Sequence, residues 1–281
     1  MTGVQTCALP ICTFLNGTIH IGKTHYGGGR DGELSSLKIT SCIKRAGIKV
    51  ARFKTGTPPR LNKKTIDFER FREQPGDVPP LPFSFSRPKV SYSQIACYLA
   101  HTNEKTHAIL RRNLKKSALF SGKITGIGPR YCPSMELKLT RFKDKKSHQL
   151  YLEPEGLDTQ EIYLNGFSSS FPKDIQSKAL RTIVGLEKAE ILRFAYAIEY
   201  DYFPPDQLYH SLESRIIKNL FFAGQVNGTS GYEEAAAQGI MAGLNVIRKL
   251  RKQSAFVLKR SDAYIGILID DIVNKGVTEP Y

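Results

Sequence analysis

The sequence predicts a mixed α/β or α+β protein with a β-rich middle. Segments with helical spacing of apolar residues alternate with short β-branched or apolar runs near both ends of the chain. Between about residues 136 and 165, apolar and polar residues alternate, which is typical of antiparallel strands. The chain has 281 residues and no internal repeat. This length is enough for about two domains.

The first elements follow from local patterns. The β-branched run at residues 18–21 predicts a short strand. Residues 34–46 have helical spacing and stop before Gly47, a natural helix C-cap. A strand is predicted over 48–53, and the Pro-Pro pair that follows ends it.

The middle of the chain begins with a proline-rich stretch at 74–90, which predicts an extended surface segment. Residues 101–114 predict a helix with Thr102 as its N-cap. Alternating residues at 136–140 and 149–152 predict strands of an antiparallel sheet.

The last third predicts two helices and one buried strand. The first helix covers about 174–186. An apolar strand over 219–224 runs into a glycine turn, and a long helix over 233–250 follows, with alanine and leucine on its apolar positions.

Composition excludes several classes of protein. With 41% hydrophobic and 24% charged residues, the chain is not generally disordered. No run approaches the ~20 apolar residues that a membrane span needs. The five cysteines contain no CxxC pair, which argues against a disulfide framework or structural zinc and fits a reducing compartment. The net charge of +15 favours a polyanionic partner, with nucleic acid as the first candidate.

Two stretches of the sequence match the letters of nucleotide-binding motifs, but the secondary structure predicted around them is not the one that these motifs require. Residues 17–24 fit GxxxxGK[ST], but their middle favours a strand and no helix is expected after Thr24. Residues 27–32 fit GxGxxG, but no strand is expected directly before them, and no carboxylate stands about 20 residues further on. We interpret these glycines as a turn packed against a neighbour or a ligand.

Residues 219–245 read NLFFAGQVNGTSGYEEAAAQGIMAGLN and have two interpretations. A strand delivers a glycine-rich turn, and the helix after it has little side-chain bulk. Such a helix can approach a flat ligand closely, and its N-terminal dipole favours the negative charge of a reduced flavin. Alternatively, alanine and glycine simply allow tight packing of helix against sheet.

The motif AGQVNGTSGYEEAAAQG resembles the signature of the GidA (MnmG) family of tRNA-modifying flavoenzymes. The resemblance continues in further motifs along the chain: TFLNGTIHIG, GGGR, FKTGTPPRL, TIDF, HTNEKTH, GPRYCPS, LEPEG, YAIEYDYFPPDQLY and AYIGILIDDIV. It covers essentially all of residues 13–281. Two departures from the family pattern are Leu137, where the family usually has Asp, and Phe194-Ala195, where it usually has Pro-Gly.

The resemblance implies a glutathione-reductase-type FAD-binding fold with a mixed α+β insertion domain. On this basis we expect part of the FAD-binding domain at 13–50, the insertion at 51–190, the returning FAD-binding segment at 191–250 and the start of a C-terminal helical domain at 251–281. Residues 1–12, MTGVQTCALPIC, resemble a translated sequencing-library adapter, and Cys12 stands where the family has glycine. We therefore expect an internal fragment that lacks the N-terminal Gly-rich FAD loop.

The activity implied by the resemblance is formation of 5-carboxymethylaminomethyluridine at the tRNA wobble position. It implies FAD, NADH and methylene-tetrahydrofolate as cofactors. It also implies tRNA, a GTPase partner (MnmE) in a heterotetramer and a homodimer of the full-length protein, without a membrane. The expected location is the bacterial cytoplasm or, alternatively, the mitochondrial matrix. We expect the fragment alone to be inactive. A folate- and FAD-dependent tRNA uridine methyltransferase and a non-catalytic basic RNA-binding remnant are the alternatives.

The resemblance also assigns candidate residues to FAD. Ser36 and Gln225 would contact the cofactor, and Gly224, Asn227 and Gly231 would shape the turn around its ring. For Ser36, a solvated helix position is the alternative.

Residues 128–142 match the segment that the family assigns to NAD, which makes Gly128, Pro129, Arg130 and Tyr131 candidate binding residues. The planar guanidinium of Arg130 suits a phosphate. Cys132 is the candidate catalytic residue, because carbon 5 of uracil is a poor nucleophile until a thiolate adds at carbon 6, and a neighbouring arginine lowers a thiol pKa. A buried structural cysteine is the alternative.

Two polar regions remain. His101, Asn103, Lys105 and His107 have six-residue histidine spacing, unlike a helical zinc pair, so we expect a helix cap with surface side chains and no metal, although contact with RNA phosphate or a pterin stays open. The basic runs 111–116 and 143–146 are either tRNA contacts or solvated faces.

Overall fold

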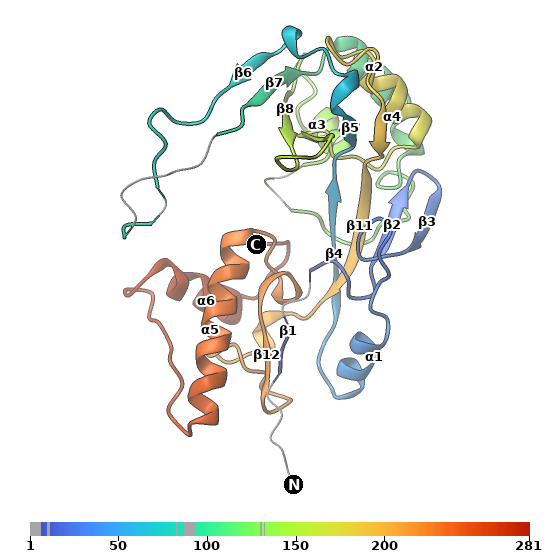
Figure 1. Ribbon diagram of the computed structural model, residues 1–281. Coiled ribbons are helices and arrows are strands. Elements are labelled where there is room, and N and C mark those ends of the chain that lie inside the picture. The colour runs from blue at the N-terminus through green and yellow to red at the C-terminus, as the bar shows by residue number, and fades with distance from the viewer. Residues whose placement is uncertain (1–6, 10–11, 83, 87–93, 130, 132) are drawn as a thin grey trace.

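A computed structural model of the chain describes residues 7–9, 12–82, 84–86, 94–129, 131 and 133–281. It has an upper and a lower lobe, and two long strands run between them (Figure 1). Among the described residues, none of the helices combines the length and the apolar character that a membrane crossing requires.

The central sheet joins the lobes. It has four antiparallel strands in the order β3-β2-β11-β4. Their bounds are β2 (Thr18–Ile21), β3 (Thr24–Gly27), β4 (Ala51–Thr57) and β11 (Tyr196–Tyr202). Every residue of β11 is buried, and β11 pairs with β4 from Tyr196–Thr57 to Tyr202–Ala51. The sequence YAIEYDY therefore forms the spine of the molecule.

The upper lobe is a six-stranded antiparallel sheet with helices packed against it. The strand order is β10-β5-β9-β8-β7-β6. The strands are β5 (Arg60–Asn62), β6 (Arg72–Gln74), β7 (Cys97–His101), β8 (Gln149–Pro154), β9 (Glu161–Asn165) and β10 (Ile191–Arg193), and the helices are α2 (Glu104–Arg112), α3 (Met135–Arg141) and α4 (Lys173–Leu180). Leu110, Leu139 and Leu180 from the helices share one core with Leu150, Leu152 and Leu164 from the sheet.

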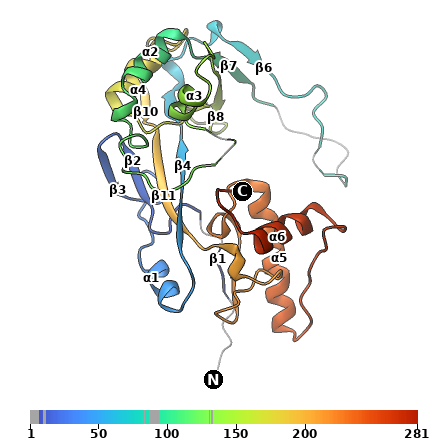
Figure 2. The ribbon, with the colours of Figure 1, turned by 180° about the vertical axis from the view of Figure 1, so that it is seen from behind.

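The lower lobe contains two helices that lie beside a short parallel pair of strands (Figure 2). The strands are β1 (Cys7–Leu9) and β12 (Leu220–Phe222), and the helices are α5 (Tyr232–Leu250) and α6 (Tyr264–Lys275). The shorter α1 (Lys38–Arg45) lies beside β4 (Figure 1). Phe221, Phe222, Met241 and Ile269 lie in the core of this lobe.

Most predicted elements are confirmed. The strands at 18–21 and 149–152, the strand and turn at 219–224 and the helix at 233–250 correspond to β2, β8, β12 and α5. The helix predicted at 174–186 is real but ends at Leu180. The helix at 101–114 begins two residues after the predicted cap, because Asn103 rather than Thr102 caps it.

Two local predictions are wrong. Residues 136–140 form helix α3 instead of a strand, since Met135 and Leu139 lie one turn apart and both are buried. Glu136 is buried between them and its Oε1 accepts hydrogen bonds from the backbone N–H and the hydroxyl of Ser170. A strand does directly precede the GxGxxG match, because β3 ends at Gly27. It is antiparallel to β2, however, and so does not form the parallel βαβ unit of a dinucleotide fold.

Candidate functional site

A cleft of about 700 Å³ lies between β11, strands β5, β8 and β9 of the upper sheet, and the N-terminal segment. Its lining comes from six separate stretches of sequence. These are Cys12–Phe14, Gly29-Arg30, Thr55–Thr57 with Arg60, Glu153–Glu155, Tyr163 with Asn165, and Tyr196 with Ile198, and Tyr232 at the start of α5 completes the rim. The cleft is therefore a product of long-range folding.

Arg60 dominates one wall of the cleft. Its Nε lies 2.7 Å from Oε1 of Glu155 on the neighbouring loop, and a guanidinium nitrogen donates to the Pro58 carbonyl at 2.9 Å. The guanidinium also lies over the Tyr163 ring, 4.6 Å from its centroid. A planar cation held on several sides keeps one orientation, so this wall is preorganised.

The opposite wall is the β11 spine, whose two faces differ. Tyr196 faces the cleft, and its hydroxyl accepts a hydrogen bond from the Asp31 N–H at 3.2 Å. Burial raises the pKa of Tyr196, so the phenol stays neutral near pH 7.

Glu199, on the other face of β11, has its Oε2 3.2 Å from Nε2 of His20. Its Oε1 accepts hydrogen bonds from the Thr125 N–H at 2.9 Å and the Gly126 N–H at 2.7 Å. Burial alone would raise the pKa of Glu199, but the adjacent His20, the two backbone hydrogen bonds and the charge of Arg52 lower it to about 2. The carboxylate therefore ties the 125–126 loop to the central sheet.

The turn between β12 and α5 is held together by one buried amide, that of Gln238. Its Oε1 accepts from the Gly224 N–H at 3.1 Å and from Nδ2 of Asn227 at 2.9 Å, and its Nε2 donates to the Thr229 hydroxyl at 2.9 Å. Gly224 has φ of +78°, a conformation that favours glycine. Gln238 thus fixes the path of the turn from inside α5.

Comparison with known proteins decides the family. The sequence model described as "Glucose inhibited division protein A" matches residues 4–254. The tRNA uridine 5-carboxymethylaminomethyl modification enzyme MnmG of Thermodesulfovibrio yellowstonii is 57% identical over 279 residues, which are 99% of this chain and 45% of that protein. The MnmG of Chlorobium chlorochromatii is 53% identical over 282 residues, 100% of this chain and 45% of that protein.

A solved structure of Aquifex aeolicus GidA superposes with a TM-score of 0.91 at 49% identity, covering 98% of this chain and 47% of that one. The chain belongs to the GidA family. Its predicted fold class, a glutathione-reductase-type FAD-binding fold with a mixed insertion, is confirmed by this match. The chain spans less than half the length of these relatives.

The domain boundaries stay a prediction. The family match begins at residue 4, within the segment interpreted as an adapter, and Cys7–Leu9 pair with Leu220–Phe222. The paired strands β4 and β11 lie on opposite sides of the predicted boundary near residue 190.

The structure brings most of the predicted FAD residues to one region. Gly224, Gln225, Asn227 and Gly231 all lie in the turn from β12 into α5. The thiol of Cys12 donates to Oε1 of Gln225 at 2.7 Å. Their roles toward FAD remain predictions.

Ser36 contacts the residues that follow Cys12. It precedes α1 and pairs with Leu15, since its N–H donates to the Phe14 carbonyl at 2.7 Å and its carbonyl accepts from Asn16 at 3.0 Å. It is half-buried and lies outside any helix, so the alternative of a solvated helix position is wrong.

The segment assigned to NAD lies along β4. Phe53 pairs with Ile127, and a Cβ on Gly128 would lie 3.3 Å from the Lys54 side chain. Pro129 is half-buried and Tyr131 is 92% exposed. Arg130 and the catalytic candidate Cys132 lie outside the described residues. Neither the glycines of the β12–α5 turn nor Gly128 lines the 700 Å³ cleft.

The polar cluster at 101–107 is a cap, as expected, but one of its members is not a surface residue. Asn103 caps α2 in a capping box with Thr106. His107 is only 1% exposed, its Nε2 is 2.7 Å from the Thr102 hydroxyl, and burial lowers its pKa. Burial also lowers the pKa of the adjacent His148, to about 4.

The two basic runs adjoin in space, because Arg111 donates to the Lys143 carbonyl at 2.7 Å. The described residues contain no group of three or more His, Cys, Asp or Glu side chains placed to hold a metal ion.

Three residues that shape the site were not singled out from the sequence. Arg60 and Tyr163 form a wall of the cleft, and Gln238 fixes the β12–α5 turn. Arg60 and Gln238 both lie inside quoted motifs, FKTGTPPRL and AGQVNGTSGYEEAAAQG, which was the available signal.

Proposed function

We propose that this chain is part of an FAD-dependent enzyme that forms 5-carboxymethylaminomethyluridine at the wobble position of certain tRNAs. The observation that carries the proposal is 57% identity over 99% of the chain to a protein named for uridine 5-carboxymethylaminomethyl modification of tRNA. The net charge of +15 is consistent with an RNA substrate.

The β12–α5 turn fits a flavin. Asn227 is fully buried, and its Oδ1 has no hydrogen-bond partner among the described residues. Gly231 is the N-cap of helix α5 and no side chain caps this end, so the first N–H groups of the helix carry a partial positive charge. Gly224, Gln225, Asn227, Gly231 and Ser36 would hold the cofactor, and bound FAD would supply two-electron redox chemistry.

The cleft would position the partner of that chemistry. Tyr163, Tyr196 and Tyr232 supply aromatic surface, and Arg60 supplies a fixed cation. Such a lining suits a flat, hydrogen-bonding ring such as an extruded base, because stacking and cation–π contacts orient a ring without charge. Tyr196 would act as a neutral phenol there, since burial raises its pKa.

Cys132 is the proposed nucleophile. Its thiolate would add to carbon 6 of uracil, which places electron density on carbon 5. After carbon 5 has been alkylated, loss of the carbon 5 proton to a base would expel the thiolate and restore the double bond of the ring. In the full-length enzyme, Cys132→Ser should abolish tRNA modification while flavin stays bound. A Cys132→Ser enzyme that still modifies tRNA would remove this residue from the mechanism.

The finer assignments are also proposals. NADH would reduce the flavin with help from residues 128–131, and methylene-tetrahydrofolate would donate the one-carbon unit. The GTPase partner MnmE would complete a heterotetramer around a homodimer in the bacterial cytoplasm, and the fragment alone would be inactive.

The decisive experiment starts from the full-length gene, expressed in a bacterium that lacks its own MnmG. Mass spectrometry of the tRNA nucleosides should show 5-carboxymethylaminomethyluridine or its derivatives restored, and the purified protein should show a flavin spectrum. A protein that binds flavin but leaves the wobble uridine unmodified, or installs a methyl group instead, would refute the proposed activity.

A further inference from the structure

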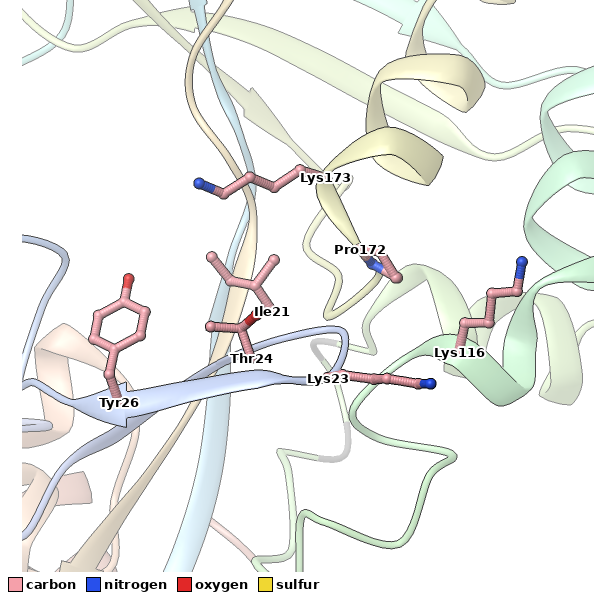
Figure 3. A pocket seen from close by; sticks show the side chains of 7 residues that line it. All are labelled: Ile21, Lys23, Thr24, Tyr26, Lys116, Pro172 and Lys173. Carbon is pink, nitrogen blue, oxygen red and sulfur yellow. The ribbon is translucent and has the colours of Figure 1, made fainter.

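A second pocket, of about 550 Å³, opens on the side of the molecule where the β2–β3 hairpin meets α4. Figure 3 shows lysines from three separate elements around it: Lys23 in the hairpin, Lys116 in the short 3-10 turn Leu114–Lys116, and Lys173 at the start of α4. Ile21, Thr24, Tyr26 and Pro172 form the rest of its lining. We call this the lysine pocket.

One carbonyl group ties the three elements together. The Ser170 carbonyl accepts from the Gly22 N–H at 2.8 Å and from the Ala118 N–H at 3.2 Å. Gly22 has φ of +55°, and a Cβ at this position would lie 2.6 Å from Cγ of Pro172. The hairpin tip therefore packs directly on the loop before α4, and the lysine backbones are held in place before any ligand arrives.

No carboxylate of the described residues neutralises the charges of the pocket, although Nζ of Lys173 lies 5.3 Å from the centroid of the Phe194 ring. In the part of the chain that the structure describes, Lys23, Lys116 and Lys173 form no ion pair with a carboxylate. The three ammonium groups therefore favour a polyanion. In Figure 3, Lys23 and Lys116 extend to one side of Pro172 and Lys173 to the other.

Tyr26 gives the pocket an aromatic surface. Tyr26 is 38% exposed, and its hydroxyl donates to Oδ1 of Asp31 at 3.0 Å, which fixes the ring. Burial, followed by this hydrogen bond, raises the pKa of Tyr26 to about 12, so no phenolate opposes an anion. Cations beside an exposed ring and apolar side chains are how proteins hold single-stranded nucleic acid.

We propose that the lysine pocket binds a short single-stranded segment of the tRNA substrate, with one base on Tyr26 and three neighbouring phosphates at Lys23, Lys116 and Lys173. This site rests on the proposed function for its ligand and is separate from the cleft. The residues 17–24 that imitate a phosphate loop would thus meet phosphate after all, through Lys23 on a hairpin rather than through a loop and helix.

The test is tRNA binding by the 281-residue chain, measured by fluorescence anisotropy with a labelled, unmodified tRNA transcript over a series of KCl concentrations. The pocket variant combines Lys23→Gln, Lys116→Gln and Lys173→Gln. The control combines Lys44→Gln, Lys218→Gln and Lys259→Gln, three exposed lysines that do not line the pocket. Both variants lose the same net charge, so only local contact distinguishes them.

The pocket variant should bind at least tenfold more weakly than the control, and its salt slope should fall by about 2, as expected for three single-strand phosphate contacts. Tyr26→Leu should weaken binding at least about fivefold while Tyr26→Phe keeps it, because only the ring stacks on a base. Unchanged circular dichroism would confirm that the variants fold.

Three outcomes would overturn the inference. If the unsubstituted chain binds tRNA and both triple variants bind alike, the site is wrong while the proposed function stands. Competition by micromolar uridine monophosphate would show a free-nucleotide site instead of an RNA contact. Failure of the unsubstituted chain to bind tRNA would reject the inference and weaken the proposed function with it.

Discussion

The central sheet and the lysine pocket share the β2–β3 hairpin but hold their charges in opposite ways. In the sheet, Nε2 of His20 lies 3.2 Å from Glu199, and Arg52 lies 2.7 Å from Asp201. In the pocket, no lysine has a carboxylate partner among the described residues. Paired charges in the sheet fix the fold, whereas unpaired charges are available to a ligand. Stability measurements should therefore separate the two regions.

The largest effect is expected at Glu199. Glu199→Leu removes the acceptor of two backbone N–H groups and leaves His20 unpaired, and buried groups without partners are costly. The free energy of unfolding should fall by about 3 kcal/mol in urea titrations followed by circular dichroism. Glu199→Gln keeps an acceptor and should lose less. A loss below about 1 kcal/mol for the leucine variant would contradict a structural role.

The same carboxylate predicts an acid sensitivity that the lysine pocket lacks. The folded pKa of Glu199 is about 2, below the ~4.3 of an unfolded glutamate, so its contribution is complete above about pH 5 and disappears as pH falls toward 2. The stability gap between the native chain and Glu199→Gln should shrink by about 2–3 kcal/mol over that range. A constant gap would mean that the pKa is not depressed.

Arg60 should show an intermediate effect. Arg60→Ala loses the ion pair with Glu155 and the contact with the Tyr163 ring, which together predict a loss of about 1–2 kcal/mol in the same unfolding assay. Arg60→Lys keeps the charge but not the planar fork, so it should recover only part of the loss. Full recovery by lysine would show that charge alone matters in this wall.

The smallest effect is expected for the lysine pocket. Its triple glutamine variant should change the free energy of unfolding by no more than about 0.5 kcal/mol, because exposed, unpaired charges contribute little to folding. Thermal unfolding at low and moderate salt checks this. A loss of more than about 1 kcal/mol would place these lysines among the structural charges and remove the contrast with the sheet.

Local sequence patterns predict the secondary structure correctly where the tertiary contacts of the segment favour the same conformation. The β-branched residues 18–21 and the Ala-rich helix after Gly231 form what their patterns predict. Residues 136–140 do not, because a Leu-Lys-Leu run fits a strand and one helical turn equally well. Contacts with the distant Ser170 favour the helix.

The candidate site was only partly accessible to sequence reasoning. Motif resemblance could mark the turn around Gln225, because its residues are contiguous. The cleft around Arg60 and the lysine pocket could not be predicted from the sequence, because the residues that line each of them come from segments far apart in the chain. The segments that carry Lys23, Lys116 and Lys173 are joined by backbone hydrogen bonds from Gly22 and Ala118 to the Ser170 carbonyl. Lys23 belongs to the GxxxxGK[ST] match, and a phosphate loop of that kind requires a helix that starts at the lysine. Lys23 instead lies between β2 and β3 of a hairpin, which excludes such a loop.

The ladder between β4 and β11 has a consequence for anyone who divides this protein. Its seven residue pairs join one strand that enters the upper lobe to another that leaves it. A fragment cut at residues 51 and 190 would carry β4 without β11 and so expose a row of unpaired N–H and C=O groups. Open β-edges of this kind recruit other strands. The isolated upper lobe would therefore tend to dimerise or aggregate. Co-expression with a β11 peptide should prevent this, because the peptide would pair with β4.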